Sequence, residues 1–214
     1  AAVTIPHKED IIKLIDKVDE TAEHIGATNT LINDNGKIVG HNTDYYGAVM
    51  ALKEVTKISD KKILILGAGG AARAVAYGLK KEGAEITITN RTDEKAKKLA
   101  NEFKVNVDKF RNISSLAKNS DIIINTTSAG MSPNENQSVL DEKYLTKEKI
   151  VMDIVYKPVN TKLIKTATKK RCKTITGDRM LIYQAVRQFE LWTGINPGFK
   201  EMEKKLLKQI SKGD

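Results

Sequence analysis

The sequence predicts an α/β protein built on a doubly wound parallel sheet. From residue 61 onward, short apolar runs rich in β-branched residues alternate with amphipathic helical segments. This alternation is typical of a parallel sheet that helices cover on both faces. A second sign is the glycine-rich turn at residues 67–72, which leads from an apolar strand straight into a helical pattern.

The elements of this sheet can be placed one by one. The expected strands are Lys62–Leu66, Glu85–Thr89, Val105–Val107, Asp121–Asn125, Ile150–Val155 and Thr174–Thr176. The expected helices between them are Ala71–Lys81, Asp93–Phe103, Asn112–Lys118 and Asn160–Lys170.

Residues outside this region have other patterns. Four isoleucine and leucine residues predict a short amphipathic helix over Glu9–Val18. Asn35-Gly36 between two apolar runs predicts a hairpin of Thr28–Ile32 with Lys37–Gly40. A further helix begins at Asp44, and two helical stripes cover residues 181–192 and 199–210. We expect residues 45–178 to form one domain, and 1–44 plus 179–214 to form a second, smaller α/β domain.

The turn at residues 67–72 has the features that a dinucleotide pyrophosphate requires. Gly67 permits the sharp turn, Gly69 lets phosphates approach the backbone, and Ala72 allows close packing of helix and strand. Free N–H groups at the helix N-terminus bind anions. We therefore expect a Rossmann-type cofactor site at Gly67, Ala68, Gly69, Gly70 and Ala71. The alternative is an ordinary glycine-bearing turn.

The end of the next strand favours NADP over NAD. NAD sites place an Asp or Glu there, about 20 residues past the glycines, to bind the ribose 2′-hydroxyl. This chain has Asn90-Arg91-Thr92 instead, and Lys95 follows. A guanidinium suits a 2′-phosphate, which a carboxylate would repel. The alternative is a solvated Arg91, with Thr92 or Asp93 only capping a helix.

Composition excludes several classes of function. The chain has 214 residues, one cysteine and three histidines, with no Cys/His cluster, so we expect no metal site. Its net charge is +9, but the lysines are spread along helices without interleaved aromatic residues, so we expect no nucleic-acid partner. No apolar run could span a bilayer and no signal-peptide pattern is present, so we expect no membrane partner and a cytoplasmic location.

Three polar segments lie outside the cofactor half, and each alone has a structural explanation. They are VTIPHK at 3–8, GATNT at 26–30 and NTD at 42–44. Lys8 could begin a helix, Asp44 could cap one, and Asn29 could belong to a turn. Together with GAGGAARA, NRT, NTTSAGM and GDRMLIYQA, in this order, they resemble the shikimate dehydrogenase (shikimate/quinate dehydrogenase) family over nearly the whole chain.

The resemblance implies the reversible NADP-dependent reduction of 3-dehydroshikimate to shikimate, in the route to chorismate and the aromatic amino acids. It places Lys8 and Asp44 beside the reacting oxygen. Reduction of a ketone builds negative charge on that oxygen, which a lysine ammonium can neutralise by donating a proton. His7 is the alternative acid, because imidazole groups in general titrate near neutral pH.

The resemblance also implies the contacts of both ligands. The residues expected at the substrate are Thr4, Lys8, Asn29, Asp44, Tyr156 and Gln184. The residues expected along the cofactor, beyond the glycine turn and the phosphate end, are Thr126, with Thr127 and Ser128 beside it, and Ile154, Gly177 and Met180 at the nicotinamide.

The chain departs from the family pattern before Val3. Nothing in it matches the family's Ser-x-Ser element, which holds the substrate carboxylate. We therefore expect an incomplete substrate domain that binds NADP but turns over weakly or not at all. An exposed sheet edge would favour self-association as a homodimer. The alternatives are a quinate/shikimate dehydrogenase with relaxed use of NAD and NADP, and a non-catalytic NADP-binding module.

Overall fold

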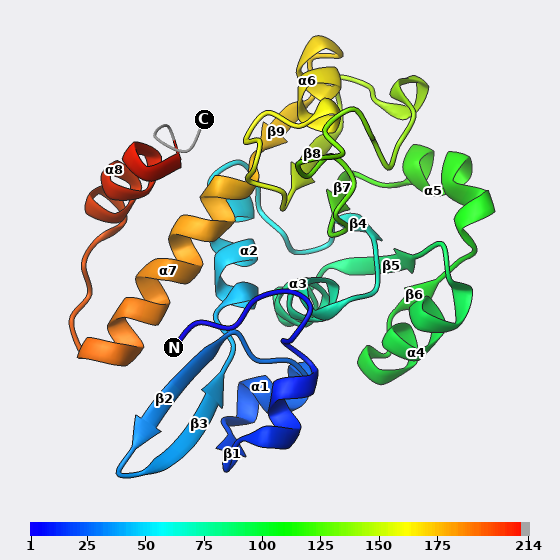
Figure 1. The fold of residues 1–214 in the computed structure, drawn as a ribbon. Coiled ribbons are helices and arrows are strands. Elements are labelled where there is room, and N and C mark those ends of the chain that lie inside the picture. The colour runs from blue at the N-terminus through cyan, green and yellow to red at the C-terminus, as the bar shows by residue number, and fades with distance from the viewer. Residues whose placement is uncertain (211–214) are drawn as a thin grey trace.

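The protein is built around a six-stranded parallel sheet with helices on both faces (Figure 1). The computed structural model describes residues 1–210. Its strand order is β6-β5-β4-β7-β8-β9. Because the chain reverses its direction of travel across the sheet after β6, β4 and β7 become neighbours at the centre, as in a Rossmann fold. The strands are β4 Lys62–Leu66, β5 Glu85–Thr89, β6 Asn106–Val107, β7 Ile122–Asn125, β8 Ile150–Asp153 and β9 Lys173–Ile175.

The alternation of side chains along each strand builds two separate cores. Ile63 and Ile65 of β4 pack with helices α2 (Asp44–Lys53), α3 (Gly70–Lys81) and α4 (Asp93–Phe103) on one face. Leu64 and Leu66 pack on the other face, against α5 (Ile113–Asn119) and α6 (Lys162–Lys169). The prediction of a doubly wound sheet is confirmed, and the boundaries of its strands and helices lie within two residues of those predicted.

A smaller sheet lies beside the large one, with the order β1-β3-β2. Strands β2 (Thr30–Asp34) and β3 (Lys37–His41) form the predicted hairpin. Its turn places Asn35 and Gly36 at φ values of 53° and 90°. Positive φ at both positions is what Asn-Gly hairpin turns supply.

The predicted helix over Glu9–Val18 is wrong. The structure has a short 3-10 helix at Asp10–Leu14, then β1 (Lys17–Val18), which pairs in parallel with β3. None of the five residues of this 3-10 helix is buried, and Leu14 is 80% exposed. Helix α1 (Glu20–Ile25), which the sequence analysis missed, follows instead, capped by the Asp19 side chain and ended by Gly26 at φ 68°.

Helix α2 packs against α3, which covers the large sheet, and against the long helix α7 (Gly177–Thr193). A Cβ at Gly47 would lie 2.6 Å from the Met180 carbonyl oxygen of α7, so only glycine allows these helices to approach so closely. Arg179 of α7 pairs with Glu54 after α2 and with Glu203 of α8 (Phe199–Ile210), which holds α8 beside α7.

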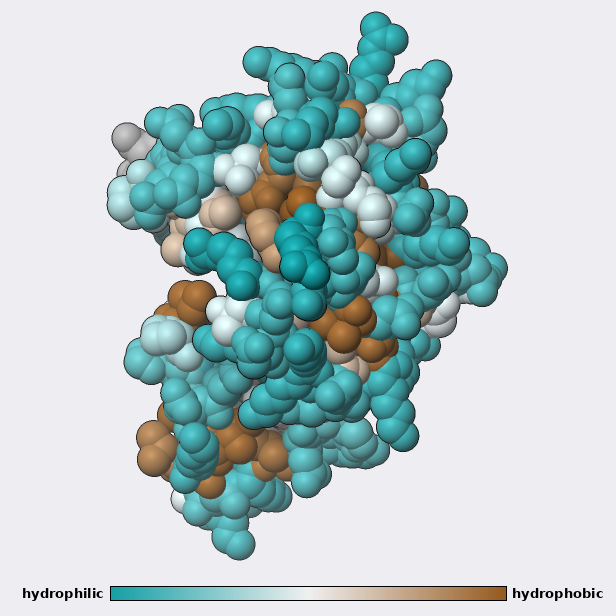
Figure 2. All heavy atoms as spheres, turned by 90° about the vertical axis from the view of Figure 1, so that its right-hand side faces the viewer, coloured by the Kyte–Doolittle hydropathy of each residue, from teal (hydrophilic) through white to brown (hydrophobic). Residues whose placement is uncertain are grey.

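The surface and the helices are those of a strongly charged chain. The face in Figure 2 is mainly hydrophilic, in line with a charged-residue content of 29%. Within residues 1–210, every helix is too short or too polar to cross a lipid bilayer. The two-domain division at residues 44 and 178 stays a prediction, and its residues 211–214 lie outside the described part of the chain.

Candidate active site

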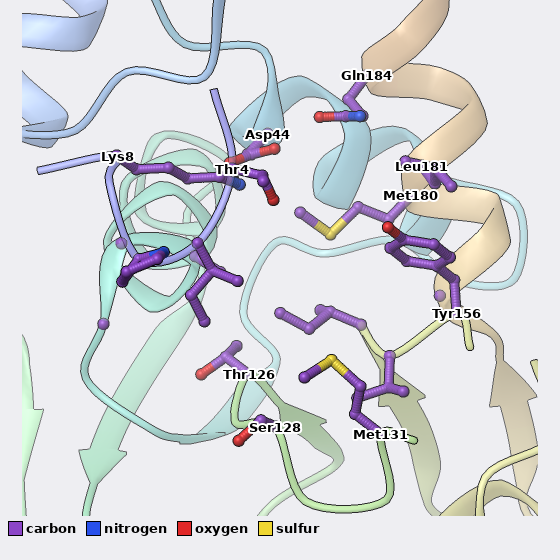
Figure 3. Close-up of a pocket in the computed structure, with 18 of the residues that line it drawn as sticks. Thr4, Lys8, Asp44, Thr126, Ser128, Met131, Tyr156, Met180, Leu181 and Gln184 are labelled. Carbon is purple, nitrogen blue, oxygen red and sulfur yellow. Dashed lines mark hydrogen bonds and ion pairs between the residues drawn. The ribbon is translucent and has the colours of Figure 1, made fainter. Parts of the chain in front are cut away.

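A cavity of about 570 Å³ opens at the carboxyl ends of the central strands. Residues 2–6, 8 and 9 and the start of α2 line it on one side, and α7 lines it on another. The turns after β4, β7 and β8 complete its lining. In open α/β sheets, ligands bind at this edge, next to the point where the strand order reverses. Figure 3 shows polar side chains from several elements gathered around this space.

Lys8 and Asp44 form an ion pair in the cavity wall. Lys8 Nζ donates to Asp44 Oδ2 at 2.6 Å, and their side chains are 18% and 3% exposed. Asp44 stands at the first position of α2, where the helix dipole favours a negative charge. Lys8 lies against the glycine turn, since a Cβ at Gly70 would be 3.3 Å from Lys8 Cβ. The proposed acid is therefore adjacent to the expected cofactor site.

Asn29 lies outside the cavity lining and orients the Asp44 carboxylate through a hydrogen bond. The Thr43 backbone N–H donates to Asn29 Oδ1 at 2.8 Å, which settles the orientation of the amide. Asn29 Nδ2 then donates to Asp44 Oδ1 at 2.9 Å and to Gln184 Oε1 at 2.8 Å. Because the Gln184 oxygen is used in this way, its NH₂ group is the part that can donate to a ligand. Asn29 itself is buried and orients the two residues that face the cavity.

The glycine turn fits a bound pyrophosphate. Gly67 has φ +123°, and a Cβ there would meet Thr126 Oγ1 at 2.5 Å. At Gly69 a Cβ would meet nothing within 4 Å, so the backbone faces open space. Gly69 caps α3 without a side-chain hydrogen bond, which leaves the first N–H groups of the helix available to an anion. Gly69, Gly70 and Ala71 line the cavity, while Gly67 and Ala68 form the turn behind them.

The residues expected at the 2′-phosphate lie on the surface beside this turn. The Gly67 N–H donates to the Thr89 carbonyl at 2.9 Å, which joins the end of β5 to the glycine turn. Asn90, Arg91 and Thr92 follow directly, outside the cavity lining. Arg91 and Lys95 are exposed, and the Thr92 side chain makes no capping hydrogen bond to α4. The hydroxyl and both cations are therefore accessible to an anion.

The cavity brings together most of the other predicted site residues. Those that line it are Thr4, Lys8, Asp44, Thr126, Ile154, Tyr156, Gly177, Met180 and Gln184. Figure 3 shows Lys8, Asp44 and Thr4 close together, Met180 and Gln184 on α7, and Thr126 and Ser128 on the loop after β7. His7, the alternative acid, is exposed and lies outside the cavity lining.

Two features in and beside the cavity escaped the sequence analysis. Gln188 lines the cavity and donates to Thr30 Oγ1 at 2.9 Å and to the Asn29 carbonyl at 3.1 Å. Its signal was a second glutamine four residues after Gln184 on the same helix face. Asp153 was predicted to lie within a strand that continued to Val155, but β8 ends at Asp153. The Asp153 carboxylate accepts the Val155 N–H at 3.1 Å, which turns the chain out of the sheet.

The environment of Asp153 has a consequence for stability. Burial raises the pKa of Asp153 to about 6, although hydrogen bonds from Thr161, Val155 and Asn125 lower it.

Within the described residues, no group of three or more His, Cys, Asp and Glu side chains could hold a metal ion.

We predict that the folded protein gains stability from Asp153 as pH falls from about 7 to 4. The raised pKa means that the native state binds a proton more readily than the unfolded chain, whose Asp groups titrate at about 3.9. The free energy of unfolding should rise by up to about 2–3 kcal/mol relative to an Asp153→Asn variant, since one pKa unit corresponds to about 1.4 kcal/mol. Urea unfolding at several pH values measures this difference. If the difference in free energy of unfolding between wild type and Asp153→Asn does not change with pH, the three hydrogen bonds offset the effect of burial on the pKa of Asp153.

This chain is similar to proteins of known function over most of its length. The family model for shikimate/quinate 5-dehydrogenase matches residues 49–175, the C-terminal domain model of shikimate 5′-dehydrogenase matches 179–207, and the substrate-binding domain model of shikimate dehydrogenase matches 1–31. Shikimate dehydrogenase (NADP⁺) of Methanocaldococcus jannaschii is 43% identical over 98% of this chain and 77% of that protein.

Solved structures are similar to this chain as well. A crystal structure of a shikimate dehydrogenase in complex with NADP⁺ superposes with a TM-score of 0.91 at 42% identity, over 98% of this chain and 76% of that one. The quinate dehydrogenase of Corynebacterium glutamicum in complex with NAD has a TM-score of 0.88 at 33% identity, over 97% of this chain and 77% of that one. The chain belongs to the shikimate dehydrogenase family.

Proposed function

We propose that this chain catalyses the reversible NADP-dependent reduction of 3-dehydroshikimate to shikimate, with Lys8 as the general acid and base. The observation that carries the proposal is the Lys8–Asp44 pair in the wall of the cavity, next to the glycine turn. An ammonium group, a carboxylate and a phosphate-binding turn meet at one cavity, which is the arrangement that reduction of a polyhydroxylated ketone requires.

The chemistry of the cavity follows from its charges. When bound, NADPH supplies the hydride and NADP⁺ accepts it in the reverse direction. As negative charge grows on the ketone oxygen, the Lys8 ammonium donates a proton to it, and in oxidation the Lys8 amine removes that proton. Asp44 orients Lys8 through the 2.6 Å hydrogen bond and can accept a hydrogen bond from a substrate hydroxyl. Asp44 therefore keeps the acid in place through both directions of the reaction.

Other residues divide the cavity between the two ligands. Thr4, Tyr156 and Gln184 line the cavity. Thr4 and the Gln184 amide nitrogen can bind ring hydroxyls, and Tyr156 would face the substrate near the nicotinamide. Met180, Ile154 and Gly177 give the cavity an apolar lining, against which the nicotinamide would lie. Thr126 and the glycine turn complete the cofactor side.

The domain division is part of this proposal. We assign residues 1–44 with 179–214 to substrate binding and 45–178 to the cofactor, a division that the separate family models for 1–31, 49–175 and 179–207 support. A homodimer and a cytoplasmic location stay predictions.

We predict that Lys8→Met lowers kcat by about 10²–10⁴-fold, the usual contribution of a positioned acid or base. Methionine keeps the length and packing of the side chain but cannot carry the proton. Initial rates of shikimate-dependent NADP⁺ reduction measure the effect. The matched control is Lys13→Met. The Lys13 side chain is 78% exposed, and its amine pairs only with Asp10 among the described residues. Unchanged turnover in Lys8→Met, or its loss in His7→Asn, would transfer the acid–base function away from Lys8.

We predict that Arg91→Ala and Lys95→Ala each raise KM for NADP⁺ about tenfold or less and leave KM for NAD⁺ nearly unchanged. A hydrogen bond to a charged group contributes about 1.5–3 kcal/mol, and exposure reduces that value. Steady-state kinetics with both cofactors measure the ratio, with Lys98→Ala on the same helix as control. Wild-type protein that uses NAD⁺ as well as NADP⁺ would instead favour the alternative of relaxed cofactor use.

A further inference from the structure

Asp153 is a fully buried carboxylate that lies outside the catalytic pair and the cavity lining. It ends β8, and its hydrogen-bond partners among the described residues are all uncharged donors. Asn125 Nδ2 donates to Oδ1 at 2.9 Å, the Val155 N–H donates to Oδ1 at 3.1 Å, and Thr161 Oγ1 donates to Oδ2 at 2.7 Å. A buried carboxylate is costly unless its hydrogen bonds are satisfied, so a carboxylate kept here needs a reason.

The first partner leads into the turn after β7. Asn125 Oδ1 accepts from the Thr127 backbone N–H at 3.0 Å and from Thr127 Oγ1 at 2.7 Å. Asn125 Nδ2 also donates to the Ala129 carbonyl at 3.2 Å. Asp153 therefore sets the orientation of the Asn125 amide, and that amide holds residues 126–129.

The other two partners lead into the turn after β8 and into α6. The Val155 N–H bond to Asp153 shapes the exit from β8, and Ile154, Val155 and Tyr156 follow. Thr161 caps α6 by accepting the Ile164 N–H at 3.2 Å. Thr161, where the segment after β8 enters α6, is thereby bound to the same carboxylate.

Both turns form the cavity next to the glycine turn. Thr126, Thr127 and Ser128 come from the first, and Ile154, Val155 and Tyr156 from the second. Thr126 Oγ1 also donates to the Leu66 carbonyl at 2.8 Å and lies 2.5 Å from the position that a Cβ of Gly67 would take. A shift of the first turn would therefore reach the glycine turn directly.

We propose that Asp153 is a positioning residue, which holds the turns after β7 and β8 in the one arrangement that accepts the nicotinamide half of NADP. This inference rests on the proposed function. Asp153 touches neither cavity nor ligand, and it acts through Asn125 on one side and Val155 on the other. The Asp153 carboxylate thus fixes the position of the turn after β7 relative to the turn after β8.

The hydrogen-bond polarity makes the proposal testable. An ionised carboxylate only accepts, and all three partners donate to it. In Asp153→Asn the amide oxygen can still accept from Asn125 and Val155, and the Thr161 hydroxyl can rotate to accept from the amide NH₂ group. In Asp153→Leu, a side chain of similar size, all three acceptor sites are lost.

The experiment measures NADP⁺ binding by calorimetry, together with KM and kcat, in Asp153→Leu and Asp153→Asn. We expect Asp153→Leu to raise Kd for NADP⁺ at least about tenfold, and Asp153→Asn to stay within about threefold of wild type, since each tenfold corresponds to about 1.4 kcal/mol. The matched control is Asp121→Leu, at the opposite end of β7, where the carboxylate accepts only the Lys62 N–H among the described residues. It should leave Kd unchanged.

A second variant protects the test against misfolding of Asp153→Leu. Thr161→Val keeps the volume, lies outside the cavity lining and removes both the donor to Asp153 and the cap of α6, so a raised Kd for NADP⁺ would support action through the Asp153–Thr161 arm of the network. Wild-type affinity in both Asp153→Leu and Thr161→Val would overturn the proposal. Because binding is measured without substrate, this result differs from failure of the proposed function, in which NADP⁺ binds and shikimate is not oxidised.

Discussion

The ion pair between Lys8 and Asp44 is the interaction on which the organisation of this molecule depends. It joins residues that lie 36 positions apart in the chain, at 2.6 Å, with Asp44 almost fully buried. A buried carboxylate must be paired and hydrogen-bonded, or its burial destabilises the fold. Asn29 supplies the second donor, and its own amide is fixed by the Thr43 backbone. The small sheet, the start of α2 and α7 are therefore held together around one charged pair.

The large sheet supplies the other half of the site. Its two faces are closed by separate apolar cores, and the cavity opens at the carboxyl edge of the strands. The cavity forms where this edge meets the residues that carry Lys8 and the helix that carries Gln184. The acid comes from one part of the chain and the phosphate-binding turn from another, and the packing of Lys8 against Gly70 brings them together.

The local sequence pattern predicted the large sheet well, because strands buried on both faces of a parallel sheet read as short apolar runs. The pattern failed at Glu9–Val18, because none of the residues of the 3-10 helix Asp10–Leu14 is buried and Lys17–Val18 pair in parallel with β3 instead. The motifs predicted Lys8, Asp44 and the glycine turn. The bond between Asn125 and Asp153 could not be predicted, because it depends on the adjacency of β7 and β8 in the sheet. Nor could the sequence show that Asn29 acts through Asp44 and Gln184.

The central claim is that Lys8 and Asp44 act as one unit, and a double-mutant cycle on kcat/KM for shikimate tests it most directly. The four proteins are wild type, Lys8→Met, Asp44→Asn and the double variant. If Asp44 serves to orient Lys8, most of the effect of Asp44→Asn disappears once Lys8 is gone and only its hydrogen bond to a substrate hydroxyl is lost, so the double variant should lose far less than the product of the two single losses. If the two losses in kcat/KM multiply, the residues act independently and the account is contradicted.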